Sequence, residues 1–249
     1  MIHTDQRDAD VFEDAARLAA GKGLIRFTRF LDPAQAAQAA QIARAMRCGF
    51  SQWGGYPQAE RIIGCFHPYE EAVEDAAYPV VCLHTQIQTK FSRITHRDLL
   101  GAFMALGLTR SCIGDIIISD RDVYLFSTEQ MAGFIASSLT ASGKVSLDFS
   151  ILDEVPTMPE PEGTSFSAVV SSLRLDAVLA SAYHLSRSEA AECVRSGIVK
   201  VDHLPSERVD LVLKEGALLS VKGKGRVRLQ SVNGMTKKQR IGISLFRYE

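Results

Sequence analysis

A proline-rich, acidic segment divides this chain into two parts of opposite charge. From Glu154 to Gly163 it holds three prolines, three acidic residues and one glycine. Proline fixes the backbone φ angle and lacks an N–H donor, so this composition predicts an extended linker. Residues 1–165 carry a net charge of −7, and residues 166–249 a net charge of +6. The sequence therefore predicts a basic C-terminal module joined to an acidic body.

Length and composition are those of a globular protein with two or three domains. The chain has 249 residues, 46% hydrophobic and 23% charged, and a domain averages about 150 residues. It contains no apolar run of about 18 residues, and its first residues are acidic and polar, unlike a signal peptide. We therefore expect a cytoplasmic protein that has no membrane contact. Five cysteines without a Cys-x-x-Cys pair favour buried free thiols over disulfides or a zinc site.

The fold class predicted from the hydrophobic pattern is α+β, with three domains. Residues 1–78 are expected to be mostly helical, with a helix start at Asp32-Pro33, a glycine-rich loop at 49–57 and a strand near 61–66. Residues 79–155 show the order β-α-β-β-α-β of ferredoxin-like domains, its last strand spanning 145–151. That fold hosts many functions and does not decide this one. Residues 156–164 form the expected linker.

Residues 165–249 predict a helix pair followed by a β-hairpin. Leu175, Val178, Leu179 and Ala182 share one face of the first helix. Ser186 with Glu189 three residues later is a capping box that starts the second helix, and a glycine after Ser196 ends it. The segment Gly223-Lys-Gly225 is the expected hairpin tip, because it follows a strand and opens no helix.

Basic side chains in this module suggest a polyanion as its ligand. Arg187 lies at a helix N-terminus, where free N–H groups and the helix dipole also favour phosphate. Two helices and a hairpin could bring the charges onto one face, and RNA held through phosphate contacts is the ligand that we expect. A single lysine or arginine is more often only solvated, so the prediction concerns the set. The candidate RNA-binding residues are Arg174, Ser186, Arg187, Arg195, Lys200, Lys222, Lys224, Arg226 and Arg228.

Three other features are weaker candidates for a site. Cys65-x-His67 and Cys82-x-His84 could form a metal or nucleophile cluster, but no known motif surrounds them, and we expect neither a metal, nor a cofactor, nor a catalytic residue. The Trp53–Tyr56 loop could stack on RNA bases, although packing under the loop is favoured. Residues 236–240 form a basic turn before a possible strand at 241–248, which is either an RNA contact or a lysine-guarded edge.

Four ordered blocks of the C-terminal module resemble the RNA-binding domain first described in ribosomal protein S-four. Their order and spacing make the match specific. The resemblance implies that this S-four-type domain is the main RNA contact, with Ser186 capping the helix and positioning Arg187. The blocks are Leu173-Arg-Leu-Asp176, Leu185-Ser-Arg-Ser-Glu-Ala190, Ser196-Gly-Ile-Val-Lys-Val201 and Val221-Lys-Gly-Lys-Gly-Arg226.

Upstream motifs extend the resemblance to residues 50–249 and to the YlmH family of bacterial RNA-binding proteins. They are Gly54-Gly-Tyr-Pro-Gln-Ala-Glu-Arg61, Thr95-His-Arg-Asp-Leu-Leu-Gly-Ala102 and Ile113-Gly-Asp-Ile116. This resemblance implies a non-enzymatic protein that binds ribosomal RNA and tRNA on the large ribosomal subunit. It also implies a role in ribosome-associated quality control of stalled nascent chains, with other quality-control factors as partners. We expect a monomer.

Two other functions stay open at this point. S-four domains are often appended to RNA-modifying enzymes, but residues 1–160 show no recognisable nucleophile or cofactor loop and are short for a catalytic domain. The second alternative is a protein-interaction adaptor in cell division, with the ferredoxin-like domain as its main surface. An adaptor is expected to capture its partner even after nuclease treatment.

Overall fold

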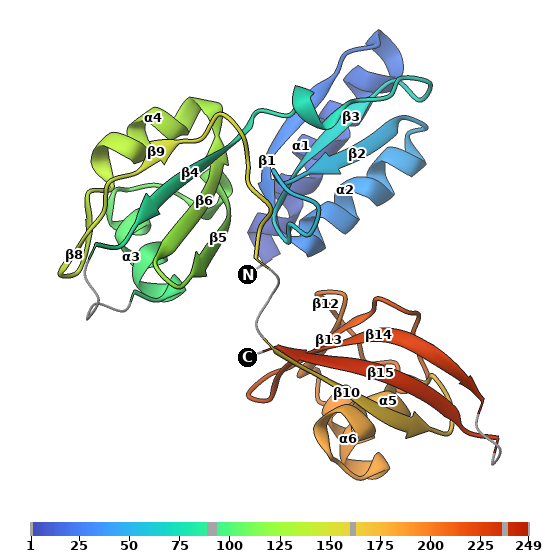
Figure 1. Ribbon diagram of the computed structural model, residues 1–249. Helices are drawn as coiled ribbons and strands as arrows, with labels where there is room; N and C mark the ends of the chain where they lie inside the picture. Colours follow the sequence, from blue (N-terminus) through green and yellow to red (C-terminus); the bar gives the residue numbers. More distant parts are fainter. Residues whose placement is uncertain (1, 89–93, 160–162, 236–238, 249) are drawn as a thin grey trace. The chain divides into compact units, whose positions relative to one another are not determined.

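The computed structural model describes residues 2–88, 94–159, 163–235 and 239–248 (Figure 1). The chain forms two compact units, Met1–Pro159 and Glu160–Glu249. The boundary between them falls inside the expected linker. The structure departs from the expected three domains, because the first two pack together as one unit.

The N-terminal part of the first unit is a sheet covered by two helices. Helices α1 (Ile2–Lys22) and α2 (Pro33–Ala45) pack on the antiparallel sheet β1-β3-β2. The strands are β1 (Arg26–Leu31), β2 (Gly49–Trp53) and β3 (Ile62–His67). The predicted helix start at Asp32-Pro33 and the strand near residues 61–66 are confirmed. The expected loop from residue 49 is wrong, because β2 occupies it, and β1 was not predicted.

The glycines at 49, 54 and 55 explain why a loop was expected where β2 lies, because a cluster of glycines usually indicates a loop. A glycine can also be needed inside a strand. A Cβ atom on Gly64 of β3 would lie 2.7 Å from the ring of Phe50 on β2, so glycine is what lets that ring cross the neighbouring strand. On α1, Phe12, Ala16 and Ala19 are buried against the sheet, whereas Val11 is 61% exposed.

The middle part has the predicted order β-α-β-β-α-β. Its elements are β4 (Val80–Gln86), α3 (His96–Ala105), β5 (Ile113–Ser119), β6 (Asp122–Thr128), α4 (Glu129–Ser138) and β9 (Ser150–Ile151). The antiparallel strand order is β5-β6-β4-β9. Both helices pack on one face, where Leu99, Phe103 and Ile135 meet Leu83 and Leu125. Short 3-10 turns, η1 (Asp75–Ala77) and η2 (Arg110–Cys112), precede β4 and β5.

The expected last strand over residues 145–151 is wrong in extent. Strand β8 (Val145–Ser146) pairs with β7 (Ala141–Ser142) in a separate hairpin, and only Ser150 and Ile151 join the sheet beside β4. Val145, Leu147 and Phe149 are nevertheless buried in the core under the helices. The alternating pattern therefore indicated burial correctly, while strand pairing depended on hydrogen-bond partners that the pattern does not contain.

A second core joins the two parts of the first unit. Phe30 and Ile63 from the N-terminal sheet pack with Cys82 and Phe126 from the middle sheet. Met158, from the expected linker, is buried in the same cluster. The proline-rich segment is therefore partly packed on the first unit before the boundary.

The second unit is a six-stranded antiparallel sheet with two helices on one face (Figure 1). The strand order is β10-β15-β14-β13-β11-β12. The predicted helix pair and hairpin are present, and the four expected core residues of the first helix are buried. The elements are β10 (Gly163–Val170), α5 (Leu175–Tyr183), α6 (Arg187–Arg195), β11 (Val199–Val201), β12 (Leu204–Pro205), β13 (Leu218–Val221), β14 (Gly225–Met235) and β15 (Ile241–Tyr248).

Among the described residues, no helix is both long and apolar enough to cross a membrane.

Candidate nucleic-acid interface

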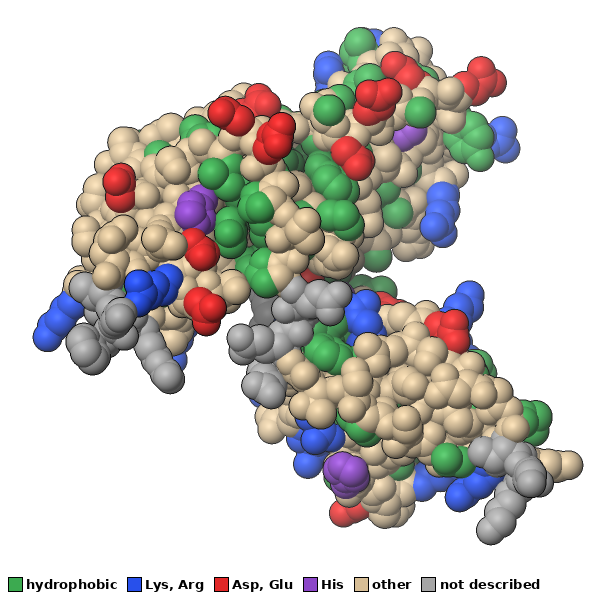
Figure 2. Space-filling model, viewed as in Figure 1, with side chains coloured by type: hydrophobic (Ala, Val, Ile, Leu, Met, Phe, Trp, Pro, Cys, Tyr) green, Lys and Arg blue, Asp and Glu red, His purple; other side chains and the backbone are tan. Residues whose placement is uncertain are grey.

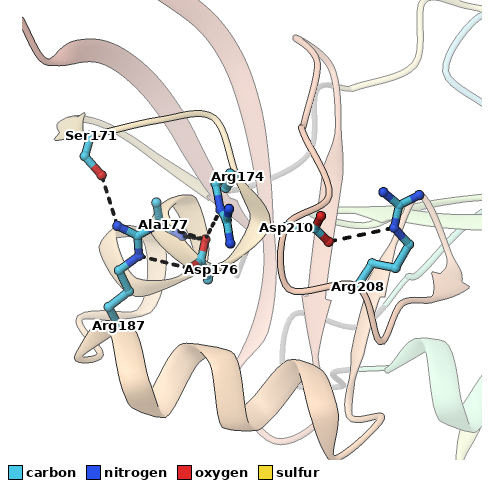
Figure 3. A network of polar contacts seen from close by, with 7 residues as sticks. All are labelled: Ser171, Arg174, Asp176, Ala177, Arg187, Arg208 and Asp210. Carbon is cyan, nitrogen blue, oxygen red and sulfur yellow. Dashed lines mark hydrogen bonds and ion pairs between the residues drawn. The ribbon is translucent and has the colours of Figure 1, made fainter.

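Arg187 and Arg174 meet at one buried carboxylate (Figure 3). Asp176, in the first turn of α5, is 5% exposed. Its Oδ2 accepts from Arg187 Nε at 2.9 Å, and its Oδ1 accepts from Arg174 Nε and Arg187 Nη2, each at 3.4 Å. Oδ1 also accepts the backbone N–H of Ala177 at 2.9 Å. Arg187 Nη1 reaches the Ser171 hydroxyl at 3.4 Å.

The electrostatics of this cluster favour the ion pair. Burial alone raises the pKa of Asp176, but the hydrogen bonds and charges of Arg187 and Arg174 outweigh it and hold the pKa below its ordinary value. Arg187 thus ties the start of α6 to the start of α5, a role that sequence reasoning missed. The Arg187 side chain is still 52% exposed, which leaves part of its guanidinium facing solvent.

The N-terminus of α6 carries the predicted capping box. Ser186 Oγ accepts from the backbone N–H of Glu189, and Glu189 Oε2 accepts from the backbone N–H of Ser186 at 2.7 Å. These hydrogen bonds, together with the charge of Lys224, lower the pKa of Glu189. A carboxylate therefore already occupies the helix N-terminus, which weakens the case for a phosphate at that position.

The predicted hairpin tip is present and is anchored to α5. Gly223 and Gly225 have φ angles of +80° and +85°, a conformation that glycine adopts without strain. The Tyr183 hydroxyl donates to the carbonyl of Gly225 at 3.0 Å and lies 3.2 Å from the carbonyl of Leu219. Lys222 and Lys224 project from this anchored tip and are exposed.

The sheet face opposite the helices carries further predicted cations. Lys200 pairs with Ser220, and Ser220 pairs with Arg226, so these side chains form a row across β11, β13 and β14. Arg228 lies two residues further along the same face. The intervening side chains, such as Val227 and Leu229, are buried against the helices.

Two aromatic residues of β15 join this row. Arg226 lies over the ring of Tyr248, 5.0 Å from its centroid, and Arg228 Nε donates to the Tyr248 hydroxyl at 2.6 Å. Phe246 meets Tyr248 edge to face at 5.0 Å. Sequence reasoning missed both aromatics, although their spacing of two predicts a shared strand face. We call this surface the outer sheet face, formed by Lys200, Arg226, Arg228, Phe246 and Tyr248.

The nine predicted residues do not share one surface. Arg174, Ser186 and Arg187 lie at the helix starts, Arg195 is exposed in the last turn of α6, and the two tip lysines extend the hairpin. Lys200, Arg226 and Arg228 face away from both helices. The view in Figure 2 likewise shows Lys and Arg side chains spread around the rim of this unit. The basic side chains were expected on one face of the unit. They do not lie there, because side chains along a strand alternate between the two faces of a sheet. Residues 236–238 of the expected basic turn lie outside the described residues.

The motif residues of the first unit form a polar cluster between its two parts. Asp115 accepts from the Tyr56 hydroxyl at 2.8 Å and from the backbone N–H groups of Glu60 and Arg61 at 2.7 and 3.1 Å. The Arg61 guanidinium donates to the carbonyls of Ile113, Phe30 and Arg110. The ring of Tyr56 stacks on Phe126 with the centroids 5.0 Å apart. The Trp53–Tyr56 loop is therefore packed, as favoured from the sequence.

The Cys and His residues form no metal site among the described residues. Cys65 and Cys82 are fully buried, and burial raises their pKa values to about 11 and about 12. Both thiols are therefore protonated at neutral pH and are poor nucleophiles. The expectation of buried thiols holds for these two and for Cys48, whereas Cys112 and Cys193 are partly exposed. His84 instead pairs with Asp122.

A comparison with known protein families finds a match to the middle part of the chain. Residues 74–154 match the family model described as "Putative RNA-binding domain in YlmH". This range covers the β-α-β-β-α-β module and holds 6 Lys and Arg against 10 Asp and Glu. The match therefore falls on an acidic module and not on the basic C-terminal unit.

Two further comparisons agree with this match. The chain is 32% identical over 247 residues to ribosome-associated protein quality control protein P2 of Bacillus subtilis (strain 168), covering 97% of this chain and 96% of that protein. A solved structure, cell division protein ylmH from Streptococcus pneumoniae, matches with a TM-score of 0.52 at 18% identity, over 61% of this chain and 92% of the other. That likeness concerns the fold alone. With the identity extending over nearly its whole length, this chain belongs to the YlmH family of RNA-binding proteins.

Proposed function

We propose that this protein binds ribosomal RNA and tRNA on the large ribosomal subunit and acts in quality control of stalled nascent chains. The observation that carries the proposal is the full-length likeness to a protein named for ribosome-associated quality control. The match of the middle module to an RNA-binding domain model supports the same function. In this role the chain works as a monomer in the cytoplasm, where ribosomes are found.

The outer sheet face and the hairpin tip supply the RNA contacts in this proposal. Arg226 and Arg228 present guanidinium groups beside the Tyr248 ring, a combination suited to phosphate contact and to stacking. The exposed tip lysines add point charges next to them along the chain. Arg187 has a secondary part, because its main partner is Asp176.

The protein acts by binding and not by catalysis in this proposal. Among the described residues the two most buried thiols are held protonated, and the carboxylates with clearly perturbed pKa values are engaged in structural hydrogen bonds. Neither group is arranged as an acid–base pair beside a nucleophile. Incubation with ribosomal RNA followed by nucleoside mass spectrometry tests this point, and a modified nucleotide would contradict it.

Cosedimentation of the full chain with separated ribosomal subunits tests the proposed function. We expect the protein to pellet with large subunits, and to be released when salt is raised, because phosphate contacts displace counterions. A nuclease-treated sample separates RNA binding from adaptor function. Partner capture that persists after nuclease treatment, with no binding to intact subunits, would favour the adaptor and contradict the proposal.

A further inference from the structure

The middle sheet has a face without helices that is covered along only half of its length. On β4 the side chains of this face run from buried Cys82 to partly exposed His84 and exposed Gln86. On β6 they run from buried Phe126 to the partly exposed Tyr124. The covered half packs on the N-terminal sheet, in the cluster that holds Cys82 and Phe126. The other half is partly accessible within this unit, and its Tyr124 packs against the edge of that cluster.

Two ring side chains lie at the centre of the accessible half. His84 and Tyr124 are directly opposite each other on β4 and β6, the two central strands of the sheet. Their ring centroids are 4.9 Å apart and their planes are tilted by 31°. Rings at this distance and tilt overlap partly face to face, so they form a short stack that an unpaired base can extend on an outer ring face.

Polar side chains next to the two rings hold the His84 ring in place and can form hydrogen bonds with a ligand. His84 Nε2 lies 2.8 Å from Asp122 Oδ1, which also accepts from Gln86 Nε2 at 3.4 Å. The His84 side chain is 26% exposed and the Asp122 side chain 34% exposed, so this pair is not enclosed in the core. The ring of His84 is held in place, while amide and carboxylate groups face the solvent next to it.

Charge decides which part of a nucleic acid this surface would take. The module carries more acidic than basic residues, and Asp122 lies next to the rings, so a phosphate is disfavoured here. A base is uncharged and offers a π-face to the rings and polar edges to Gln86 and Asp122. Bases in a double helix are stacked and unavailable, whereas those of single strands and loops can be splayed out.

We propose that His84 and Tyr124 form a stacking platform for an unpaired RNA base. This proposal rests on the proposed RNA-binding function and deepens it, because it gives the acidic middle module a contact of its own. The match of residues 74–154 to a model of a putative RNA-binding domain supports it, since the excess of acidic residues in this module disfavours binding through phosphates alone. The platform contributes selectivity for unpaired RNA, while the C-terminal unit contributes the salt-sensitive affinity.

Fluorescence anisotropy of the full chain with a labelled oligoadenylate tests the platform. Tyr124→Leu removes the ring and keeps an apolar side chain, and Tyr124→Phe keeps the ring. Phe134→Leu is the matched control, because Phe134 is 46% exposed on α4, on the other side of the module. Tyr124→Leu removes the ring on which the base stacks, so we expect it to weaken binding about tenfold. Tyr124→Phe and Phe134→Leu should bind as the wild type does.

A second measurement avoids any folding defect of the variant. In the wild-type chain, adding oligoadenylate should shift the NMR signals of the His84 ring protons, whereas adding a fully paired RNA duplex should leave them in place. Unchanged His84 signals at saturating oligoadenylate, or wild-type affinity of a folded Tyr124→Leu variant, would overturn the platform while RNA binding itself stands. A wild-type chain that binds neither oligoadenylate nor ribosomal RNA would overturn the platform and the proposed function together.

Discussion

At the scale of single residues, the short-range rules were reliable, whereas the long-range ion pair could not be foreseen. The capping box of Ser186 and Glu189 could be predicted because both partners lie within one turn of the chain. The Asp176–Arg187 pair could not, because it depends on how α5 packs against α6. Its effect on function is indirect, since it fixes the first turn of one helix against the other.

Replacing Asp176 tests that structural role. Asp176→Asn keeps the size of the side chain but removes the charge that balances Arg187 and Arg174, so we expect the second unit to lose about 1–3 kcal/mol of stability. Urea unfolding followed by circular dichroism measures the change. An Asp210→Asn variant, whose carboxylate is exposed, is the control and should be unchanged. Equal stability of both variants would contradict the role.

The same pair predicts a pH dependence. The pKa of Asp176 in the folded chain lies below the ordinary aspartate value of about 3.9, so its stabilisation is complete above that pH. The stabilisation is lost as the pH falls through the folded-state pKa, when the carboxylate becomes protonated. The difference in unfolding free energy between the wild type and Asp176→Asn should therefore shrink below about pH 4. A difference that stays constant down to about pH 2 would show that the charge is not responsible.

At the scale of elements, helices with clear caps such as α2 and α6 were predicted, whereas strands β1 and β2 were not. Helix α5, the hairpin β13–β14 and the order of the middle module follow from periodicity and turn residues in the sequence. Strand β2 was missed because Gly49 indicated a loop. The outer sheet face was missed because strand order, which places β15 beside β14, depends on partners distant in sequence.

The start of α6 gives a test at this scale. Ser186→Ala removes the acceptor for the Glu189 N–H and should cost about 1 kcal/mol, whereas Ser186→Thr retains a hydroxyl and should cost less. Thermal unfolding of the three proteins measures this. If both variants melt at the same temperature as the wild type, the cap does not stabilise the helix.

Arg61 tests the joint between the two parts of the first unit. Arg61→Lys keeps a positive charge but cannot reach the carbonyls of Phe30, Ile113 and Arg110 together, because the guanidinium is a planar group with several donors. We expect the first unit to be less stable by about 1–3 kcal/mol. Arg29→Lys, at an exposed position of β1, is the control. Unfolding curves of the two variants that coincide would contradict the role of Arg61.

At the scale of the whole molecule, the change in charge correctly marked the division into two units. The boundary after Pro159 lies within the segment that is rich in prolines and acidic residues. The match to a model of a putative RNA-binding domain falls on the acidic module, which net charge does not single out. The ring pair of His84 and Tyr124 in that module becomes apparent only once β4 and β6 are placed side by side.

Because the second unit has its own core, it should fold alone. Its buried cluster draws on residues from Val170 to Leu245, all within the unit. We expect a fragment of residues 160–249 to give a cooperative thermal transition and native-like circular dichroism. A fragment that is unfolded at low temperature would show that the first unit is needed for its stability.

The salt dependence of RNA affinity tests the central claim most directly. The claim is that Arg226 and Arg228 hold RNA phosphates on the outer sheet face. In the full chain, the double variant Arg226→Gln/Arg228→Gln should bind large-subunit RNA more weakly. The slope of log affinity against log salt concentration should also become shallower, by about 0.7–0.9 for each phosphate that the variant no longer neutralises. The control is Arg208→Gln with Lys214→Gln, which removes the same charge from the loop before β13 and should leave the slope unchanged. Equal slopes for the wild type and the Arg226/Arg228 variant would contradict the claim.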